Sequence, residues 1–328
     1  MADLKTKLEL RSPIIAGSCG LTSDVEKMVE MEKAGVGAVV LKSIFEEQIN
    51  EETSGVFKAG YGMGDAYPEA EDYIKAYIRS NTIQKYVELV RNAKSRLTIP
   101  VIASVNCFSG GEWVSFARQL EEAGADALEL NVFILPVNEF KESAEVENVY
   151  FEIVKSIKSQ IKIPVSVKIS HYFTNLSAFV DKIKAYGANA TTLFNRFYEP
   201  DININTLEMG AASVFSTAAE LRTTLRWTGI LAGKDKKLEI SASTGVHGGE
   251  AAVKLLLAGA TTVQVCSVLY EKGIHVIEDI NNFIGKWMDS KAFKTIGDYR
   301  GMLSYSSIEN PDLYERAQFM KYFSNKQY

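Results

Sequence analysis

The sequence predicts an α/β protein built as a closed (β/α)8 (TIM) barrel, and three observations support this prediction. Eight short apolar runs of strand length alternate with eight stretches of helical periodicity. The same helix-to-strand transition is repeated four times along the chain. Polar residues gather at the carboxyl ends of the apolar runs, where barrels of this kind carry their active sites.

The predicted strands are rich in Val, Ile, Ala and Leu without clean alternation, as expected for strands buried on both faces of a parallel sheet. They are 13–16, 38–41, 100–105, 127–131, 164–169, 191–194, 238–242 and 262–266. The predicted helices are 24–34, 83–96, 112–123, 144–158, 176–186, 211–226, 250–257 and 274–288.

Four of these helices end in the same way, with a glycine shortly before the next strand. The glycines are Gly35, Gly124, Gly187 and Gly259. A glycine at this position suits the left-handed conformation that closes a helix. A doubly wound open sheet is the alternative fold, but the polar residues at nearly every strand end favour the barrel.

No composition shift or linker divides the chain, so residues 1–328 are predicted to form a single domain. The longest departure from the pattern, residues 44–80, is predicted to be a long loop after the second strand. The last forty or so residues are predicted to form an aromatic extension that packs on the barrel. Its aromatic residues are Tyr299, Tyr305, Tyr314, Phe319, Tyr322 and Phe323.

Composition excludes several classes of function. The chain has 328 residues and a net charge of −5 without a basic run, which argues against a nucleic-acid or anionic-membrane partner. Cys19, Cys107 and Cys266 are too few and too far apart for a disulfide framework or a zinc site, which favours a reducing compartment. With neither a signal sequence nor an apolar span, the protein is expected to be cytoplasmic.

Four strand ends supply residues suited to bind an anion or a flat polar ring. Lys42 and Lys168 close the second and fifth strands, and Asn131 and Asn195 close the fourth and sixth. A purely structural alternative is a lysine that reaches solvent or pairs with a carboxylate such as Glu129. Two lysines and two asparagines in one ring favour the functional interpretation.

The last two strands end in small residues that predict a phosphate site. Such residues let backbone amides approach a phosphate, and the following helix N-terminus adds a favourable partial charge. The residues are Ser243, Thr244, Gly245, Cys266 and Ser267, with His247-Gly248-Gly249 opening the next helix. The alternative is that these glycines only form turns. The histidines are not spaced for metal binding, and no metal is predicted.

Taken together, these stretches resemble the dihydroorotate dehydrogenase family and the related flavin domain of dihydropyrimidine dehydrogenase. The resemblance covers about residues 12–290. It is carried by Gly17-Ser18-Cys19, AVVLKS at 38–43, AGADALELN at 123–131, IPVSVKIS at 163–170 and STGVHGGEAAVKLLLAGATTVQV at 243–265.

The resemblance implies an FMN at the barrel mouth with a pyrimidine stacked on its ring. It assigns flavin contacts to Lys42 and Lys168, and substrate or flavin edges to Asn131 and Asn195. Charge on Lys168 would stabilise the reduced, anionic flavin ring. The remaining FMN contacts that it implies are Gly17, Ser18, Ser43, Ser243, Thr244, Gly245, Cys266 and Ser267.

The reaction implied is oxidation of dihydroorotate to orotate in de novo pyrimidine synthesis. A hydride passes from C6 to the flavin N5, a general base removes the C5 proton, and a second oxidant takes the electrons away. The family also implies a homodimer.

The chain departs from the family where the base is expected. After the strand-four asparagine the family has leucine, serine and then a cysteine or serine base, whereas this chain has Val132-Phe133-Ile134-Leu135. Replacement bases are Cys107, Ser109, His171 or a tyrosine of residues 60–67. Arg196 stands where the family has a small hydroxyl residue, so an acidic or differently shaped substrate is expected.

Three alternative functions remain open at the level of sequence. The first is a flavin-dependent reductase of another ring, such as a dihydropyrimidine. The second is a phosphate-binding barrel lyase in which Lys168 forms a Schiff base. The third is a protein that binds flavin without catalysis.

Overall fold

The computed structural model describes residues 8–45, 68–106, 110–132, 134–197 and 199–315. The strands of its main sheet are β1 (Ile14–Ala16), β2 (Ala38–Val40), β3 (Ile44–Phe45), β4 (Val101–Asn106), β5 (Ala127–Asn131), β6 (Val165–Ile169), β7 (Ala190–Leu193), β10 (Glu239–Ala242) and β11 (Thr262–Val265). They follow the order β2-β1-β11-β10-β7-β6-β5-β4-β3, and β2 also pairs with β4. This extra pairing closes eight strands into a parallel barrel. The predicted (β/α)8 barrel is confirmed.

Helices follow the strands in the order that the sequence predicts. They are α1 (Val25–Lys33), α3 (Pro68–Arg96), α4 (Gly110–Glu122), α5 (Ser143–Lys158), α6 (Leu176–Ala185), α7 (Leu221–Lys234), α8 (Gly249–Ala258), α9 (Ser267–Lys272), α10 (Val276–Ser290) and α11 (Asp312–Glu315), with 3-10 turns η1 (Gly20–Ser23), η2 (Ala218–Glu220) and η3 (Ile296–Asp298). The glycines predicted to end four helices have φ values of 92°, 98°, 112° and 119°, as expected for left-handed caps. None of the described helices combines the length and apolarity needed to cross a membrane.

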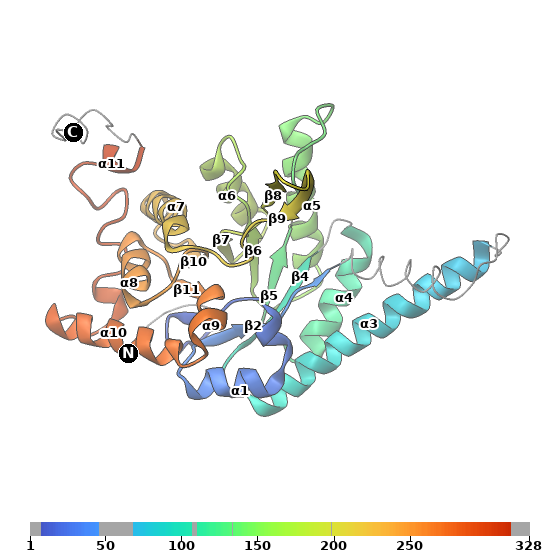
Figure 1. Ribbon diagram of the computed structural model, residues 1–328, viewed down its shortest axis with the longest axis horizontal. Helices are drawn as coiled ribbons and strands as arrows, with labels where there is room; N and C mark the ends of the chain where they lie inside the picture. Colours follow the sequence, from blue (N-terminus) through green and yellow to red (C-terminus); the bar gives the residue numbers. More distant parts are fainter. Residues whose placement is uncertain (1–7, 46–67, 107–109, 133, 198, 316–328) are drawn as a thin grey trace. The chain divides into compact units, whose positions relative to one another are not determined.

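Contacts within the chain define two compact units, which we call the N-terminal unit (16–190) and the C-terminal unit (1–15 with 191–328). The prediction of a single domain stays a prediction. In the N-terminal unit, β4, β5 and β6 are parallel neighbours, and their helices pack on one another in sequence order. Figure 1 shows α3 as a long helix that runs beside α4. The buried faces of α5 and α6 meet through the rings of Tyr150, Phe151 and Phe179.

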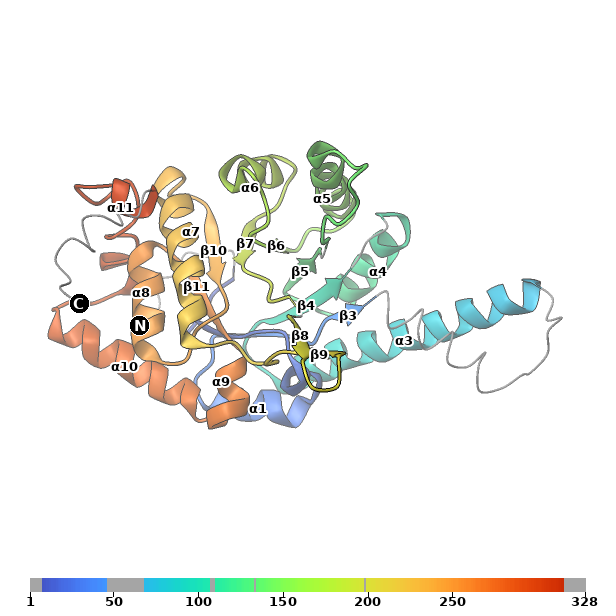
Figure 2. The ribbon, with the colours of Figure 1, turned by 45° about the horizontal axis from the view of Figure 1, so that its top comes forward.

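In the C-terminal unit, β10 and β11 are parallel and α8 packs against both α7 and α10 (Figure 2). The aromatic residues near the end of the chain belong to this unit. Tyr299 is fully buried against Trp287, and Tyr314 and Tyr305 lie directly over Gly229 and Gly233 of α7. The prediction of a packed aromatic extension is therefore confirmed as far as residue 315. Phe319, Tyr322 and Phe323 lie outside the described residues.

Two segments differ from the predicted elements. The predicted start of the helix at 211–226 is wrong. The chain forms a hairpin of β8 (Pro200–Asn203) and β9 (Glu208–Ala211), and α7 begins only at Leu221. Helix α3 begins at Pro68, so the end of the predicted 44–80 loop is helical. Residues 46–67 of that loop lie outside the described part of the chain.

Candidate active site

A row of polar side chains lies at the carboxyl ends of β5 and β6. Asn131 is opposite Lys168 in the strand register, and the two residues are 6% and 8% exposed. Glu129, two residues earlier, projects from the same face of β5. Its Oε1 atom lies 3.7 Å from Lys168 Nζ. The pairing of Lys168 with Glu129, which the sequence offered as a structural alternative, is therefore present in the barrel interior.

The row continues onto β4 through two residues that sequence reasoning missed. Ser104 lies opposite Glu129, and Val105 opposite Leu130, so Asn106 comes beside Asn131. Asn106 is buried, and its Oδ1 atom has no hydrogen-bond partner among the described residues. Because a buried polar atom without a partner is costly, this oxygen indicates a place for a ligand donor. Ser104 lies inside the predicted strand 100–105, where the sequence gives no separate signal for it, whereas Asn106 directly follows that strand and could have been found from the same strand-end pattern.

A chain of hydroxyl groups joins the loop after β1 to the ends of β2 and β4. Ser18 Oγ lies 3.0 Å from Ser43 Oγ, which lies 2.7 Å from Ser104 Oγ. The Ser43 N–H also donates to Ser18 Oγ over 2.9 Å. These hydrogen bonds place two predicted flavin contacts, Ser18 and Ser43, side by side. Gly17, next to Ser18 in the sequence, is buried. Lys42, by contrast, is exposed rather than enclosed by the strand end.

The loops after β5 and β6 enclose a cavity of about 320 Å³. Ile134 and Pro136 line it from one loop, and Ser170 and Tyr172 from the other. The Tyr150 hydroxyl hydrogen bonds to the Ile134 backbone, and burial raises the pKa of Tyr150 to about 12. The cavity adjoins the segment in which this chain departs from the family that it resembles, although Phe133 itself lies outside the described residues.

Of the replacement bases, His171 is the one that the structure describes. It follows β6, and its ring lies against Tyr172 with 4.3 Å between centroids. Partial burial lowers the pKa of His171 below its ordinary value, because desolvation disfavours the imidazolium. Cys107, Ser109 and residues 60–67 lie outside the described part of the chain.

In the C-terminal unit, the turn between β10 and α8, where the sequence predicts a phosphate site, has two consecutive residues with positive φ. Thr244 and Gly245 both have φ of 79°, which is unusual for a β-branched residue such as Thr244. The Thr244 hydroxyl donates to the Phe194 carbonyl over 3.2 Å, and the Ser243 carbonyl accepts from Thr224 Oγ1 over 2.9 Å. Consecutive backbone N–H groups in such a turn form a concavity that suits an anion.

Glycine is required within this turn for a packing reason. A Cβ atom on Gly245 would lie 2.2 Å from the backbone nitrogen of Leu221, the first residue of α7. At Gly248, the N-cap of α8, a Cβ atom would meet nothing within 4 Å. The turn is thus tightly packed on its α7 side and open at the start of α8. Cys266 is the N-cap of α9 and Ser267 is its first residue, so the predicted cradle residues of both strand ends lie at or shortly before the start of a helix.

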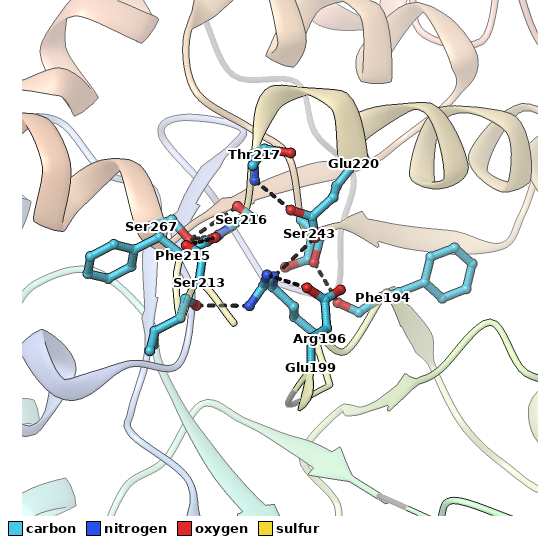
Figure 3. Close-up of polar contacts among 12 residues, drawn as sticks. Phe194, Arg196, Glu199, Ser213, Phe215, Ser216, Thr217, Glu220, Ser243 and Ser267 are labelled. Carbon is cyan, nitrogen blue, oxygen red and sulfur yellow. Dashed lines mark hydrogen bonds and ion pairs between the residues drawn. The ribbon is translucent and has the colours of Figure 1, made fainter. Parts of the chain in front are cut away.

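The structure corrects the interpretation of Arg196. Its guanidinium donates to Glu220 over 3.0 Å, to Glu199 over 3.1 Å and to the Val214 carbonyl over 3.0 Å (Figure 3). Its charge is therefore paired with two carboxylates of its own unit. Arg196 holds the loop that contains the β8–β9 hairpin, and the expectation that it faces an acidic substrate is wrong. Asn195, just before it, is half-buried.

Within the described residues, no group of three or more His, Cys, Asp or Glu side chains comes together to hold a metal ion. The cysteines that the structure describes, Cys19 and Cys266, are not joined in a disulfide bond.

The fold and the strand-end side chains are those of a (β/α)8-barrel enzyme. The family described as "Dihydroorotate dehydrogenase" matches residues 4–288. The chain belongs to the dihydroorotate dehydrogenase family, whose members are oxidoreductases that act on CH–CH groups.

Several relatives match over nearly the whole chain. The "Dihydroorotate dehydrogenase B (NAD(+)), catalytic subunit" of Thermoplasma acidophilum is 30% identical, over 92% of this chain and 99% of its own. The proteins of the same name from Thermoplasma volcanium and Pyrococcus furiosus are 27% and 26% identical, over 92% and 91% of this chain and 99% of each of theirs.

Proposed function

We propose that the protein is an FMN-dependent dehydrogenase that oxidises dihydroorotate to orotate in pyrimidine biosynthesis. The family membership and the names of the relatives support the reaction class and the substrate. The observation that carries the proposal is the buried row of Asn106, Asn131 and Lys168 at the strand ends, with one amide oxygen lacking a partner. Such a row suits a planar ring with several polar edges.

Each unit, considered by itself, has residues that fit one part of an FMN molecule. In the C-terminal unit, the turn at 243–245 and the start of α9 at Ser267 would hold the phosphate. In the N-terminal unit, Gly17, Ser18 and Ser43 would contact the ring, together with Lys42, whose exposed side chain is available to a ligand. When bound, FMN would supply the acceptor for the substrate hydride.

The chain's own residues would bind the substrate and take up its proton. Asn131 and Asn195 would hold the polar edges of the pyrimidine. Lys168 would keep a positive charge in the site, held in place by Glu129. Oxidation removes a hydride from C6 and a proton from C5, and the proton passes to a base. His171, whose pKa is lowered by desolvation, is the candidate that the structure describes. Cys107, Ser109 and the tyrosines of residues 60–67 remain the others.

A second candidate is oxidation or reduction of another dihydropyrimidine-like ring. The observation that favours it is the apolar segment at 133–135, where the family carries its base. Loss of a general base slows proton abstraction by about 10²- to 10⁴-fold. This loss would make dihydroorotate a slow substrate and leave flavin binding intact.

The geometry disfavours a Schiff-base lyase. A Schiff base forms from a neutral amine, whereas the Lys168 ammonium is paired with the buried Glu129 carboxylate.

The relatives' names connect this reaction to NAD(+) through a catalytic subunit, so an NAD(+)-linked acceptor is our proposal for the electrons. From the family resemblance we also propose a homodimer in the cytoplasm. Sedimentation of the purified protein tests the assembly, and a monomer would contradict it.

Turnover with a dye acceptor tests the proposed substrate. Dihydroorotate, dihydrouracil and dihydrothymine are supplied separately to the FMN-loaded protein, and the oxidised pyrimidines are quantified. We expect orotate formation to exceed the other two products. Faster oxidation of another ring would support the second candidate, and a colourless protein that takes up no FMN would refute both.

A further inference from the structure

A second cavity, of about 290 Å³, lies in the C-terminal unit at the opposite ends of the strands from the predicted phosphate turn. Leu238, directly before β10, and Gly259, shortly before β11, line it, so it lies at the amino ends of these strands. The turn at 243–245 follows the carboxyl end of β10, roughly 15 Å farther along the strand. The cavity is therefore separate from the proposed cofactor cradle.

The charged side chains in the wall of this cavity are both cations. They are Lys236, which follows α7, and Arg300, which follows η3. Neither forms an ion pair with a carboxylate in the part of the chain that the structure describes. Because Lys236 is exposed to solvent, an unpaired charge there is ordinary, and Arg300 is the more informative of the two.

The Arg300 guanidinium is half-buried and makes little use of its hydrogen-bonding capacity. Its Nη1 donates to Thr261 Oγ1 over 3.0 Å, which leaves other N–H donors of the planar fork for a ligand. Desolvation lowers the pKa of Arg300 below its ordinary value, and the opposing effect of the Glu239 carboxylate is smaller. Since arginine stays protonated in proteins even so, the wall holds a partly desolvated positive charge.

Two hydroxyl groups add neutral donors to the same wall. Ser304 is buried, its Oγ lies 3.0 Å from Ser307 Oγ, and both residues line the cavity. Whichever of the two donates in this contact, the other keeps a proton for a ligand. Leu238 and Met302 supply apolar surface beside these groups.

The backbone around the cavity is held in place and suits an anion despite two helix ends nearby. Carbonyl groups at a helix C-terminus carry a negative partial charge, which would oppose an anion. Here N–H groups of residues 301–305 donate to the carbonyls of Gly229 in α7 and of Leu256 and Leu257 in α8. The segment also packs tightly on α7, because a Cβ atom on Gly233 would lie 2.7 Å from the Ser306 nitrogen.

We propose that this cavity is a second anion site, which binds the phosphate group of a small phosphate monoester between Arg300 and Lys236. The planar fork of a guanidinium matches two oxygens of a phosphate. A phosphate monoester carries about two negative charges at neutral pH, which suits a wall with two cations better than a single carboxylate does. The volume is at the lower limit of small-molecule sites, which favours a compound of the size of a sugar phosphate over a dinucleotide.

Isothermal titration calorimetry of the full chain tests this site. The ligands are ribose 5-phosphate, ribose without the phosphate, and succinate as a dicarboxylate. The protein is loaded with FMN and freed of excess flavin, so that the proposed cradle is occupied. The variants are Arg300→Met, Arg300→Lys and Lys236→Met. Lys237→Met is the matched control, because it removes one positive charge from the adjacent residue, which is exposed and does not line the cavity.

We expect ribose 5-phosphate to bind the wild type at one site and more tightly than ribose or succinate. Arg300→Met and Lys236→Met should each weaken binding about tenfold or more, as for loss of a charge-assisted hydrogen bond. Arg300→Lys should bind with intermediate affinity, because it keeps the charge and loses the planar fork. Lys237→Met should change the affinity by less than about twofold, since the charge that it removes is screened by solvent.

The inference would be overturned by a wild type that does not bind ribose 5-phosphate, or by unchanged binding in Arg300→Met and Lys236→Met. An equal loss in Lys237→Met, or binding of ribose or succinate as tight as that of the phosphate, would overturn it as well. If Arg300→Met does not fold, Lys236→Met, at an exposed position, and Arg300→Lys decide the question. A protein that takes up no FMN would refute the proposed function and not this inference, because the variants still report on this cavity.

Discussion

Replacing Lys168 by methionine should destabilise the protein strongly, because it leaves the Glu129 carboxylate in the barrel interior without its cation. The side chains are 11% and 2% exposed, and the charged atoms lie 3.7 Å apart. Removing one partner of a buried pair costs about 3–5 kcal/mol. For a chain of 328 residues the unfolding entropy is about 0.7 kcal/mol/K. The midpoint should therefore fall by about 4–7 °C.

The assay is thermal unfolding of flavin-depleted protein, so that bound ligand adds no stability. The double variant Glu129→Gln/Lys168→Met removes both charges and should recover at least half of the loss, because a neutral pair of similar shape has no buried charge. Lys27→Met, in the exposed pair with Glu30, should shift the midpoint by less than about 1 °C. The argument for a buried pair fails if Lys168→Met has the same unfolding midpoint as the wild type, or if the midpoint of the double variant is no higher than that of the single variant.

Three further predictions test other parts of the account. Gly245→Ala should lower the unfolding midpoint by about 4 °C or more, because φ is 79° and the new Cβ would meet the Leu221 backbone. The control Gly248→Ala should change the midpoint little, and equal effects of the two substitutions would contradict the packing argument. Arg196→Met should speed protease cleavage within 199–220 several-fold, because three hydrogen bonds to that loop are lost. The control Arg222→Met, on the exposed face of α7, should not speed cleavage, and identical cleavage patterns for the two variants would show that Arg196 does not hold the loop. If His171 is the base, its lowered pKa means that it becomes protonated only as the pH falls below about 6.5, so flavin reduction by dihydroorotate should slow in that acid range. This acid limb of the pH profile should be absent in His171→Asn, and a profile that the substitution leaves unchanged would remove His171 from consideration.

Strand-end residues could be predicted from the sequence because a buried strand followed by a polar residue is a local pattern. Lys168 and Asn131 are register neighbours, as expected from parallel strands that end at one edge of a barrel. The left-handed glycines were predictable for the same reason, since each caps its own helix.

Other parts of the site depend on contacts between distant segments, which no local pattern records. Ser216 lies 51 residues before its partner Ser267, and Glu271 lies 24 residues after His247. Arg196 looked available for a substrate because its partners Glu199 and Glu220 are brought to it only when the hairpin loop folds back.

The β8–β9 hairpin was missed because its hydrophobic pattern is inverted. Ile202 and Met209 are paired across the hairpin and are 61% and 68% exposed. A pattern that assumes burial of apolar residues assigns the end of this segment to an amphipathic helix. The helix that does form, α7, begins after Glu220, ten residues later than predicted.

The most direct test of the central claim is the visible absorption spectrum of the purified protein before and after anaerobic addition of dihydroorotate. The account predicts flavin bands that match FMN released on denaturation and that bleach when dihydroorotate is added. Flavin bands that persist would contradict dihydroorotate as the substrate and direct attention to the apolar segment at 133–135. A protein without flavin bands, even after incubation with FMN, would contradict the account as a whole.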